Sequence, residues 1–304
     1  MTRSINDDIR YGIGEWYGRR IDAISASDKI RYATLSGSNK EPCPYRPGEG
    51  KCNKIGGVCS LAVYRKKEDG TIVLDPENPD MVTLCPMRFW QDFVVFREAA
   101  KVVLQSNAPS LIKEIGFLKS IDHTGRTTEE TVSRIDMVLA DIDTRNRIRD
   151  WCALEMQAVY FSGRSMKTEF QAIKNDPEKL LFPAGIRRPD FRSSGPKRLM
   201  PQLQIKIPAL RRWGKKMVVV VDNPFFKSIA PMKRARHISN ADIAWFVVDY
   251  YGPGATLRVA DIVLTTLESS VDGLTAGVPV SKDEFEKDLL TYLAGKRDKV
   301  IRLS

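Results

Sequence analysis

The stretches RIDMVLADID (residues 134–143) and DWCALEMQAVYFSG (residues 150–163) decide the fold. In both, apolar and polar side chains alternate with a period of two, which predicts β-strands. The polar segment between them is short enough to connect two antiparallel strands as a hairpin. We therefore predict that pairing of these strands brings Asp136 beside Glu155 and Gln157 at one edge of a sheet.

Two converging carboxylates predict a magnesium site. Asp136 and Glu155 offer the oxygen ligands that Mg²⁺ prefers in proteins. A bound Mg²⁺ can polarise a phosphodiester oxygen and lower the pKa of an attacking water. Glu114, in LIKEIGF, is a candidate third carboxylate, although a surface helix glutamate explains it equally well. Gln157 carries no charge and cannot donate as an ammonium does, so we do not assign it as a general base.

Positive charge is concentrated in one part of the chain. The 304 residues carry a net charge of +10, and residues 145–236 hold 21 Lys and Arg against 7 Asp and Glu. Concentrated charge of this kind favours a nucleic-acid partner, because each phosphate contact releases condensed counterions. Between residues 185 and 216, basic residues alternate with Pro, Gly and Ser, which predicts an extended or looped basic arm. A solvated loop is the alternative. The candidate DNA-contacting residues are Arg187, Arg188, Arg192, Ser193, Lys197, Arg198, Arg211 and Arg212.

Four of the five cysteines, Cys43, Cys52, Cys59 and Cys85, lie close together in the sequence, among Gly and Pro residues that make tight turns. In a protein of the cytosol, clustered cysteines hold a metal more often than they form disulfides. Four thiolates suit zinc or a single iron, and the sequence does not choose between them. We predict a structural metal site, the alternative being four unrelated buried thiols. Cys152 is expected to be a buried strand thiol.

The composition is that of a globular protein, with 42% hydrophobic and 28% charged residues. The sequence contains no run of 18 or more apolar residues, which a membrane-spanning helix would need. The start, MTRSINDDIRYGIGEW, lacks the apolar segment of a secretion signal, so we predict a cytoplasmic protein with no membrane partner. The two histidines, His123 and His237, are too few and too isolated for a histidine-based nuclease or zinc hydrolase site.

An Asp on one strand followed by Glu-x-Lys on the next is the signature of PD-(D/E)xK nucleases, here with Glu155-Met156-Gln157. Together with CPYRPGEGKCNKIGGVCS, LCPMRFW, PDFRSSGPKRLMPQLQIKIP and SNADIAWFVVDY, this pattern resembles the NotI family of type II restriction endonucleases over residues 43–250. The resemblance implies a tetracysteine iron site and Mg²⁺-dependent cleavage of double-stranded DNA at a GC-rich palindrome by a homodimer. Asp136 and Glu155 would be the catalytic metal-binding carboxylates, and Gln157 would take the place of the usual lysine. Such an enzyme also implies a cognate DNA methyltransferase that protects the host.

The expected architecture is an α/β fold, a restriction-endonuclease-like core with a mixed central sheet flanked by helices and a small metal-binding insert that carries the four clustered cysteines. Residues 216–226 and 241–251 are short apolar runs rich in β-branched residues, which predicts two buried strands of the core. The expected parts are a helical N-terminal part (1–39), a cysteine module (40–90) and a nuclease core with the basic arm (91–304).

Two other classes of function remain open from the residues alone. A non-catalytic zinc-containing DNA-binding regulator would use the basic arm, with Asp136 and Glu155 as ordinary hairpin residues. A repair nuclease or glycosylase would use the four cysteines for a [4Fe–4S] cluster, which their wide spacing disfavours. Plasmid digestion with and without EDTA separates enzyme from regulator, and the absorption spectrum separates a cluster from a single iron or zinc.

Overall fold

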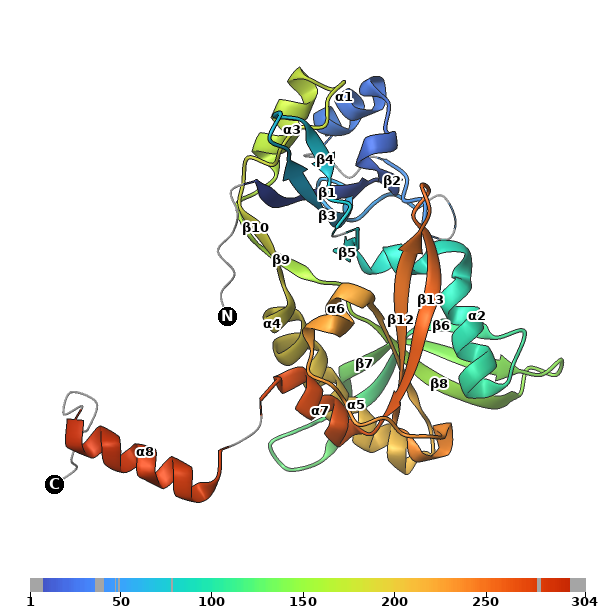
Figure 1. Cartoon of the computed structure of the whole chain (residues 1–304). Helices are drawn as coiled ribbons and strands as arrows, with labels where there is room; N and C mark the ends of the chain where they lie inside the picture. The colour runs from blue at the N-terminus through green and yellow to red at the C-terminus, as the bar shows by residue number, and fades with distance from the viewer. Residues whose placement is uncertain are drawn as a thin grey trace.

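The computed structural model describes residues 8–35, 41–46, 48, 50–77, 79–277 and 280–295. These residues form a larger sheet, a smaller sheet and a two-stranded ribbon (Figure 1). The larger sheet has the strand order β13-β12-β11-β8-β7-β6, in which β11 is parallel to β8 and β12 and the other neighbours are antiparallel. This mixed sheet with flanking helices confirms the expected α/β class. Its strands are β6 (Ser110–Ile121), β7 (Thr127–Ile142), β8 (Ile148–Met156), β11 (Met217–Asp222), β12 (Ile243–Tyr251) and β13 (Thr256–Thr265).

The central strands of the larger sheet are buried on both faces. Every residue of β11, with the sequence MVVVVD, is buried, as expected for a β-branched run in a strand covered on both sides. One face packs against α5 (Met200–Arg212). The other packs against η2 (Pro86–Phe93) and α2 (Val94–Ala99). The predicted strands within 216–226 and 241–251 are thus confirmed.

The two stretches that decided the fold form the expected hairpin. β7 and β8 are antiparallel neighbours. The turn between them is organised by Asp143, whose Oδ1 accepts hydrogen bonds from the backbone N–H groups of Arg145 and Arg147. An Asp side chain that accepts hydrogen bonds from backbone N–H groups of its own turn stabilises a tight connection, as expected for the polar segment between the two strands.

The second strand is shorter than predicted, because β8 ends at Met156 and the chain then leaves the larger sheet. The backbone N–H of Val159 donates to the carbonyl of Thr83, a residue of the smaller sheet, at 2.7 Å. Beyond this point the chain forms β9 (Tyr160–Gly163), which pairs with β10 (Arg187–Asp190) as a separate antiparallel ribbon.

The smaller sheet combines the predicted N-terminal part and the cysteine module. Its order is β2-β1-β3-β4, with β5 paired to β3. The prediction of a helical N-terminal part is wrong for residues 9–16, which form β1; apolar residues recur there at every second position, the signal of a strand. Residues 1–7 and 36–39 of that part lie outside the described residues. The strands are β1 (Ile9–Trp16), β2 (Arg19–Arg20), β3 (Val58–Lys66), β4 (Ile72–Leu74) and β5 (Val82–Thr83).

The basic arm is mostly helical, so the prediction of an extended or looped arm for residues 185–216 is wrong for residues 191–212, whereas residues 187–190 are extended, as the strand β10. After β10, the chain forms α4 (Phe191–Ser194), η4 (Gly195–Leu199) and α5 without a break. Pro196 and Pro201 are the second residues of η4 and α5, and Pro208 lies inside α5, so the arm is helical despite its prolines. The deciding feature is an apolar stripe at helical spacing, which packs on the larger sheet: Leu199, Leu203, Ile207 and Leu210.

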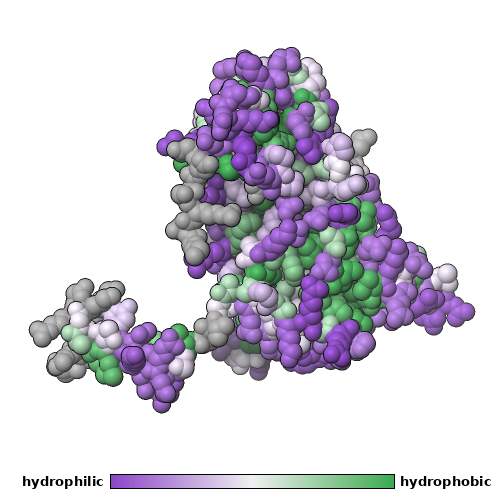
Figure 2. Space-filling view, in the orientation of Figure 1, coloured by the Kyte–Doolittle hydropathy of each residue, from purple (hydrophilic) through white to green (hydrophobic). Residues whose placement is uncertain are grey.

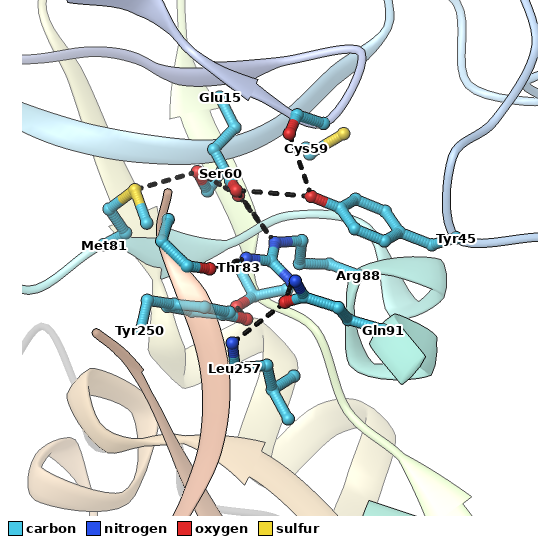
Figure 3. A network of polar contacts seen from close by, with 12 residues as sticks. Glu15, Tyr45, Cys59, Ser60, Met81, Thr83, Arg88, Gln91, Tyr250 and Leu257 are labelled. Carbon is cyan, nitrogen blue, oxygen red and sulfur yellow. Dashed lines mark hydrogen bonds and ion pairs between the residues drawn. The ribbon is translucent and has the colours of Figure 1, made fainter. Parts of the chain in front are cut away.

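A buried ion pair joins the two sheets (Figure 3). Arg88 of η2 donates to Glu15 of β1 at 2.8 Å, and both side chains are within 1% of complete burial. The guanidinium of Arg88 lies between the rings of Tyr45 and Tyr250, and it donates to the carbonyl of Ala255 next to β13. These contacts link the smaller sheet to the larger one.

The remaining helices lie around the sheets, except for α8, which stands apart from them (Figure 1). Figure 2 shows both hydrophilic and hydrophobic residues on its surface, and it has no buried residue. No helix within the described ranges is long and apolar enough to cross a membrane. These helices are η1 (Ile21–Ala23), α1 (Ala26–Leu35), η3 (Ala100–Leu104), α3 (Lys167–Asn175), α6 (Asn223–Ser228), η5 (Ile238–Asn240), α7 (Leu267–Thr275) and α8 (Lys282–Gly295).

Candidate active site

Asp136 and Glu155 face each other across β7 and β8. The register pairs Met137 with Leu154, so the next position along the ladder places Asp136 opposite Glu155 with both side chains on one face. The nearby charge of Asp136 is one of the causes that raise the pKa of Glu155, as expected for carboxyl groups at paired positions of neighbouring strands. The pair lies on inner strands, and not at a lateral edge of the sheet as expected.

Glu155 is buried beside a lysine that the sequence pattern did not single out. Its side chain is 10% exposed, and its Oε2 accepts from Nζ of Lys206, on α5, at 2.6 Å. Burial raises the pKa of Glu155 to about 7, because the loss of solvent outweighs the favourable charge of Lys206, and the charge of Asp136 raises it further. Asp136, in contrast, is exposed.

Gln157 lies just beyond the end of β8, in the lysine position of the motif. Its backbone N–H donates to the carbonyl of Val220 in β11 at 2.9 Å. Its side-chain amide donates to the carbonyl of the next residue, Ala158, at 2.5 Å. The amide is therefore engaged with the local backbone, and the positive charge next to Glu155 comes from another element.

Glu114 lies on β6, not on a helix, and the register places it across from Asp136. Its backbone has a positive φ of 56°, which is uncommon for a residue other than glycine. The side chain is 76% exposed, and its Oε2 lies 3.7 Å from Nη1 of Arg134. Its role in the site therefore stays a prediction.

A cleft of about 690 Å³ opens next to Glu155 and is lined by three parts of the chain. Glu155 and Gln157 come from the end of β8, Lys197 and Arg198 come from η4, and Lys54 comes from the cysteine module. The cleft thus brings a carboxylate of the β7–β8 hairpin, the basic arm and the smaller sheet to one place. The other lining residues are Asn53, Leu84, Cys85, Pro86, Met156, Ala158, Val159, Tyr160, Phe161, Pro201 and Gln202.

The predicted DNA-contacting residues divide into exposed and buried ones. Arg188, Arg192, Lys197, Arg198, Arg211 and Arg212 are exposed, and Ser193 is half-buried. Arg198 stacks over the ring of Tyr160 at 3.8 Å, beside the cleft. Arg211 forms ion pairs with Asp242 and Glu268.

Arg187 is the buried member of the set. Its side chain is 1% exposed, and its Nη2 lies 2.5 Å from Oε2 of Glu169 on α3. The same guanidinium donates to the carbonyls of Arg164 and Ser165. A guanidinium enclosed in this way cannot reach a phosphate without unfolding its surroundings, so we leave Arg187 out of the proposed DNA contacts.

The four clustered cysteines line one small cavity together with Tyr17, Tyr45 and Lys54. Cys52, Cys59 and Cys85 are buried, and burial raises the pKa of these three thiols. Within the described ranges, however, no three or more His, Cys, Asp or Glu side chains are spaced to hold a metal ion. The thiols are thus gathered by the fold, without the spacing of a ligand set. Cys152 is fully buried in β8, as expected.

A protein-family model described as restriction endonuclease NotI matches residues 26–258. This chain belongs to the NotI restriction endonuclease family. No curated protein matches it. As a member of the NotI family it is a type II site-specific deoxyribonuclease that acts on double-stranded DNA, so the DNA-binding regulator and the repair glycosylase are set aside.

Lys206 is a residue of the candidate site that the sequence pattern did not reveal. A signal for it was present, because it lies on the apolar stripe of α5, three residues after Leu203 and one before Ile207. A charged residue on the buried face of a helix needs a partner of opposite charge. The prediction of a loop for this segment hides the ion pair, because the need for a partner of Lys206 follows only if the segment is treated as a helix.

Proposed function

We propose that this NotI-family enzyme hydrolyses phosphodiester bonds at the Asp136–Glu155 pair, with Mg²⁺ as its cofactor. The proposal is carried by the strand register, which places Asp136 opposite Glu155, and by the cleft that Glu155 lines. Two carboxylates fit Mg²⁺, a hard ion that usually keeps several waters or substrate phosphate oxygens. When bound, the ion would polarise the scissile phosphate and lower the pKa of the attacking water.

The chain's own residues have separate tasks in this proposal. Asp136 is exposed and supplies a carboxylate on the solvent side, whereas Glu155 supplies one held from the protein side. Lys197 and Arg198, on the cleft wall, would neutralise backbone phosphates and fix the register of the duplex. Gln157 is neutral and bound to the backbone, so it accepts no proton from the attacking water.

Site recognition is proposed to rest on exposed arginines of the helical arm. Arginine reads the O6 and N7 atoms of guanine in the major groove with a bidentate contact, which suits a GC-rich site. A palindromic site presents the same half-site twice, so we propose a homodimer with two-fold symmetry. The enzyme would act in the cytoplasm beside a cognate methyltransferase. The proposed contacts are Arg188, Arg192, Ser193, Lys197, Arg198, Arg211 and Arg212.

The cysteine module is proposed to bind one iron or zinc ion through Cys43, Cys52, Cys59 and Cys85. The shared cavity supports this proposal, and metal binding would require the sulfur atoms to come to ligand distances. Metal analysis of the purified protein tests it, with about one iron or zinc per chain as the expected result. A metal content near zero in protein purified without chelators would contradict it.

Plasmid cleavage tests the catalytic assignment. Asp136→Ala and Glu155→Ala should each abolish cutting, with EDTA doing the same to the unmodified enzyme, while DNA binding in EDTA stays within about threefold. Glu130→Ala, which changes an exposed carboxylate farther out on β7, is the matched control and should cut normally. Full cutting by either active-site variant would refute the assignment.

A further inference from the structure

The motif position of this enzyme carries Gln157, yet a lysine reaches Glu155 from elsewhere in the chain. Lys206 arrives from α5, 51 residues after Glu155, and the two side chains form a buried ion pair at 2.6 Å. We propose that Lys206 is a positioning residue of the active site, which holds Glu155 in one orientation for its ligand. This inference rests on the proposed function, because it takes Glu155 as a catalytic carboxylate.

The geometry separates this role from that of a lysine in the motif. Lys206 is 1% exposed and does not line the cleft, whereas Glu155 does. The ammonium therefore lies on the protein side of the carboxylate and acts on a ligand in the cleft through Glu155. Because Lys206 engages Oε2, we assign the second oxygen, Oε1, to that ligand.

The charges explain why such a residue is needed. Glu155 is buried and also faces the carboxylate of Asp136, and an ionised group in that position is costly unless a cation compensates it. Gln157 is neutral and cannot compensate it. Lys206 supplies the charge from a rigid helix, between the buried side chains Leu203 and Ile207, so its ammonium has little freedom to move.

Three variants test the inference. K206M keeps the length and removes the charge, K206R keeps the charge and adds volume, and I207V is a control that alters the packing of the same helix without altering charge. The first readout is Mn²⁺ affinity of the protein, measured by electron paramagnetic resonance without DNA. Loss of a residue that orients a metal ligand typically lowers metal affinity or activity by about 10- to 100-fold. We expect this loss for K206M, an intermediate value for K206R, and wild-type affinity for I207V.

Plasmid cleavage rates should decrease in the same order, from I207V through K206R to K206M. The DNA affinity of each variant in EDTA should stay within about twofold of that of the unmodified enzyme. A side chain that only fills space predicts the opposite order, since Met would replace Lys without loss and the larger Arg would be the worst. Circular dichroism first establishes that each variant is folded. If K206M does not fold, K206Q takes its place in the same order, because its polar amide tolerates burial but lacks the charge that compensates Glu155.

The outcomes separate this inference from the proposed function. Wild-type Mn²⁺ affinity and cleavage in K206M, or in K206Q, would overturn the role of Lys206 while Glu155→Ala remains inactive. Cleavage by Glu155→Ala would instead overturn the catalytic assignment itself, whatever the behaviour of Lys206.

Discussion

Replacing Arg88 with methionine should destabilise the fold by about 3–5 kcal/mol, the usual cost of removing one partner from a buried ion pair. Arg88 and Glu15 are 0% and 1% exposed and lie 2.8 Å apart, so the remaining carboxylate would stay buried without a compensating charge. The rings of Tyr45 and Tyr250, with centroids 4.6 and 4.3 Å from the guanidinium, would also lose a cation–π contact (Figure 3).

Urea unfolding followed by circular dichroism measures this loss. The control is Lys101→Met, because Lys101 pairs with Glu98 on the surface and its side chain is 51% exposed, so the expected cost is below about 1 kcal/mol. The double variant Glu15→Gln/Arg88→Met should recover part of the stability, since no lone charge is then buried. A single variant within about 1 kcal/mol of the unmodified protein would show that this pair does not hold the two sheets together.

Three further predictions concern the basic residues and Glu155. Arg198→Gln should reduce the slope of log DNA affinity against log salt concentration by about 1 without a change in the unfolding midpoint. Arg187→Gln, which breaks the buried pair with Glu169, should instead lower the unfolding midpoint. Salt titrations and thermal melts check both variants, and an unchanged slope for Arg198→Gln would remove Arg198 from the DNA contacts. Because burial raises the pKa of Glu155 to about 7, this carboxyl is protonated below that pH and ionised above it. Mn²⁺ affinity should therefore fall about tenfold for each pH unit below 7 and level off above it, and equal affinities at about pH 5.5 and 7.5 would contradict the assignment of Glu155.

Local patterns in the sequence are enough to predict the hairpin and the buried strands. In β7 and β8 the alternation of side chains sets which residues share a face, so the amino-acid pattern alone predicts that Asp136 and Glu155 lie together. The β-branched run of β11 predicts a buried strand for the same reason. The NotI family is recognisable because the cysteine and nuclease segments follow one another in order.

Long-range packing decided the rest. The basic arm became a helix, despite its prolines, because the stripe from Leu199 to Leu210 is buried on the larger sheet. Residues 9–16 carry the local alternation of a strand, but their partner strand β3 lies more than 40 residues away in the sequence, so only the fold shows their pairing.

The positive charge beside Glu155 also depends on the tertiary structure. A sequence motif records only neighbours along the chain, and position 157 of this chain holds no lysine. Lys206 reaches Glu155 only once α5 has packed against the sheet. Residue type and periodicity therefore determined which side chains could do the chemistry. The packing of helix on sheet determined which of them meet. The physical reason is that the free energy of burial depends on surfaces that come together only in the folded chain.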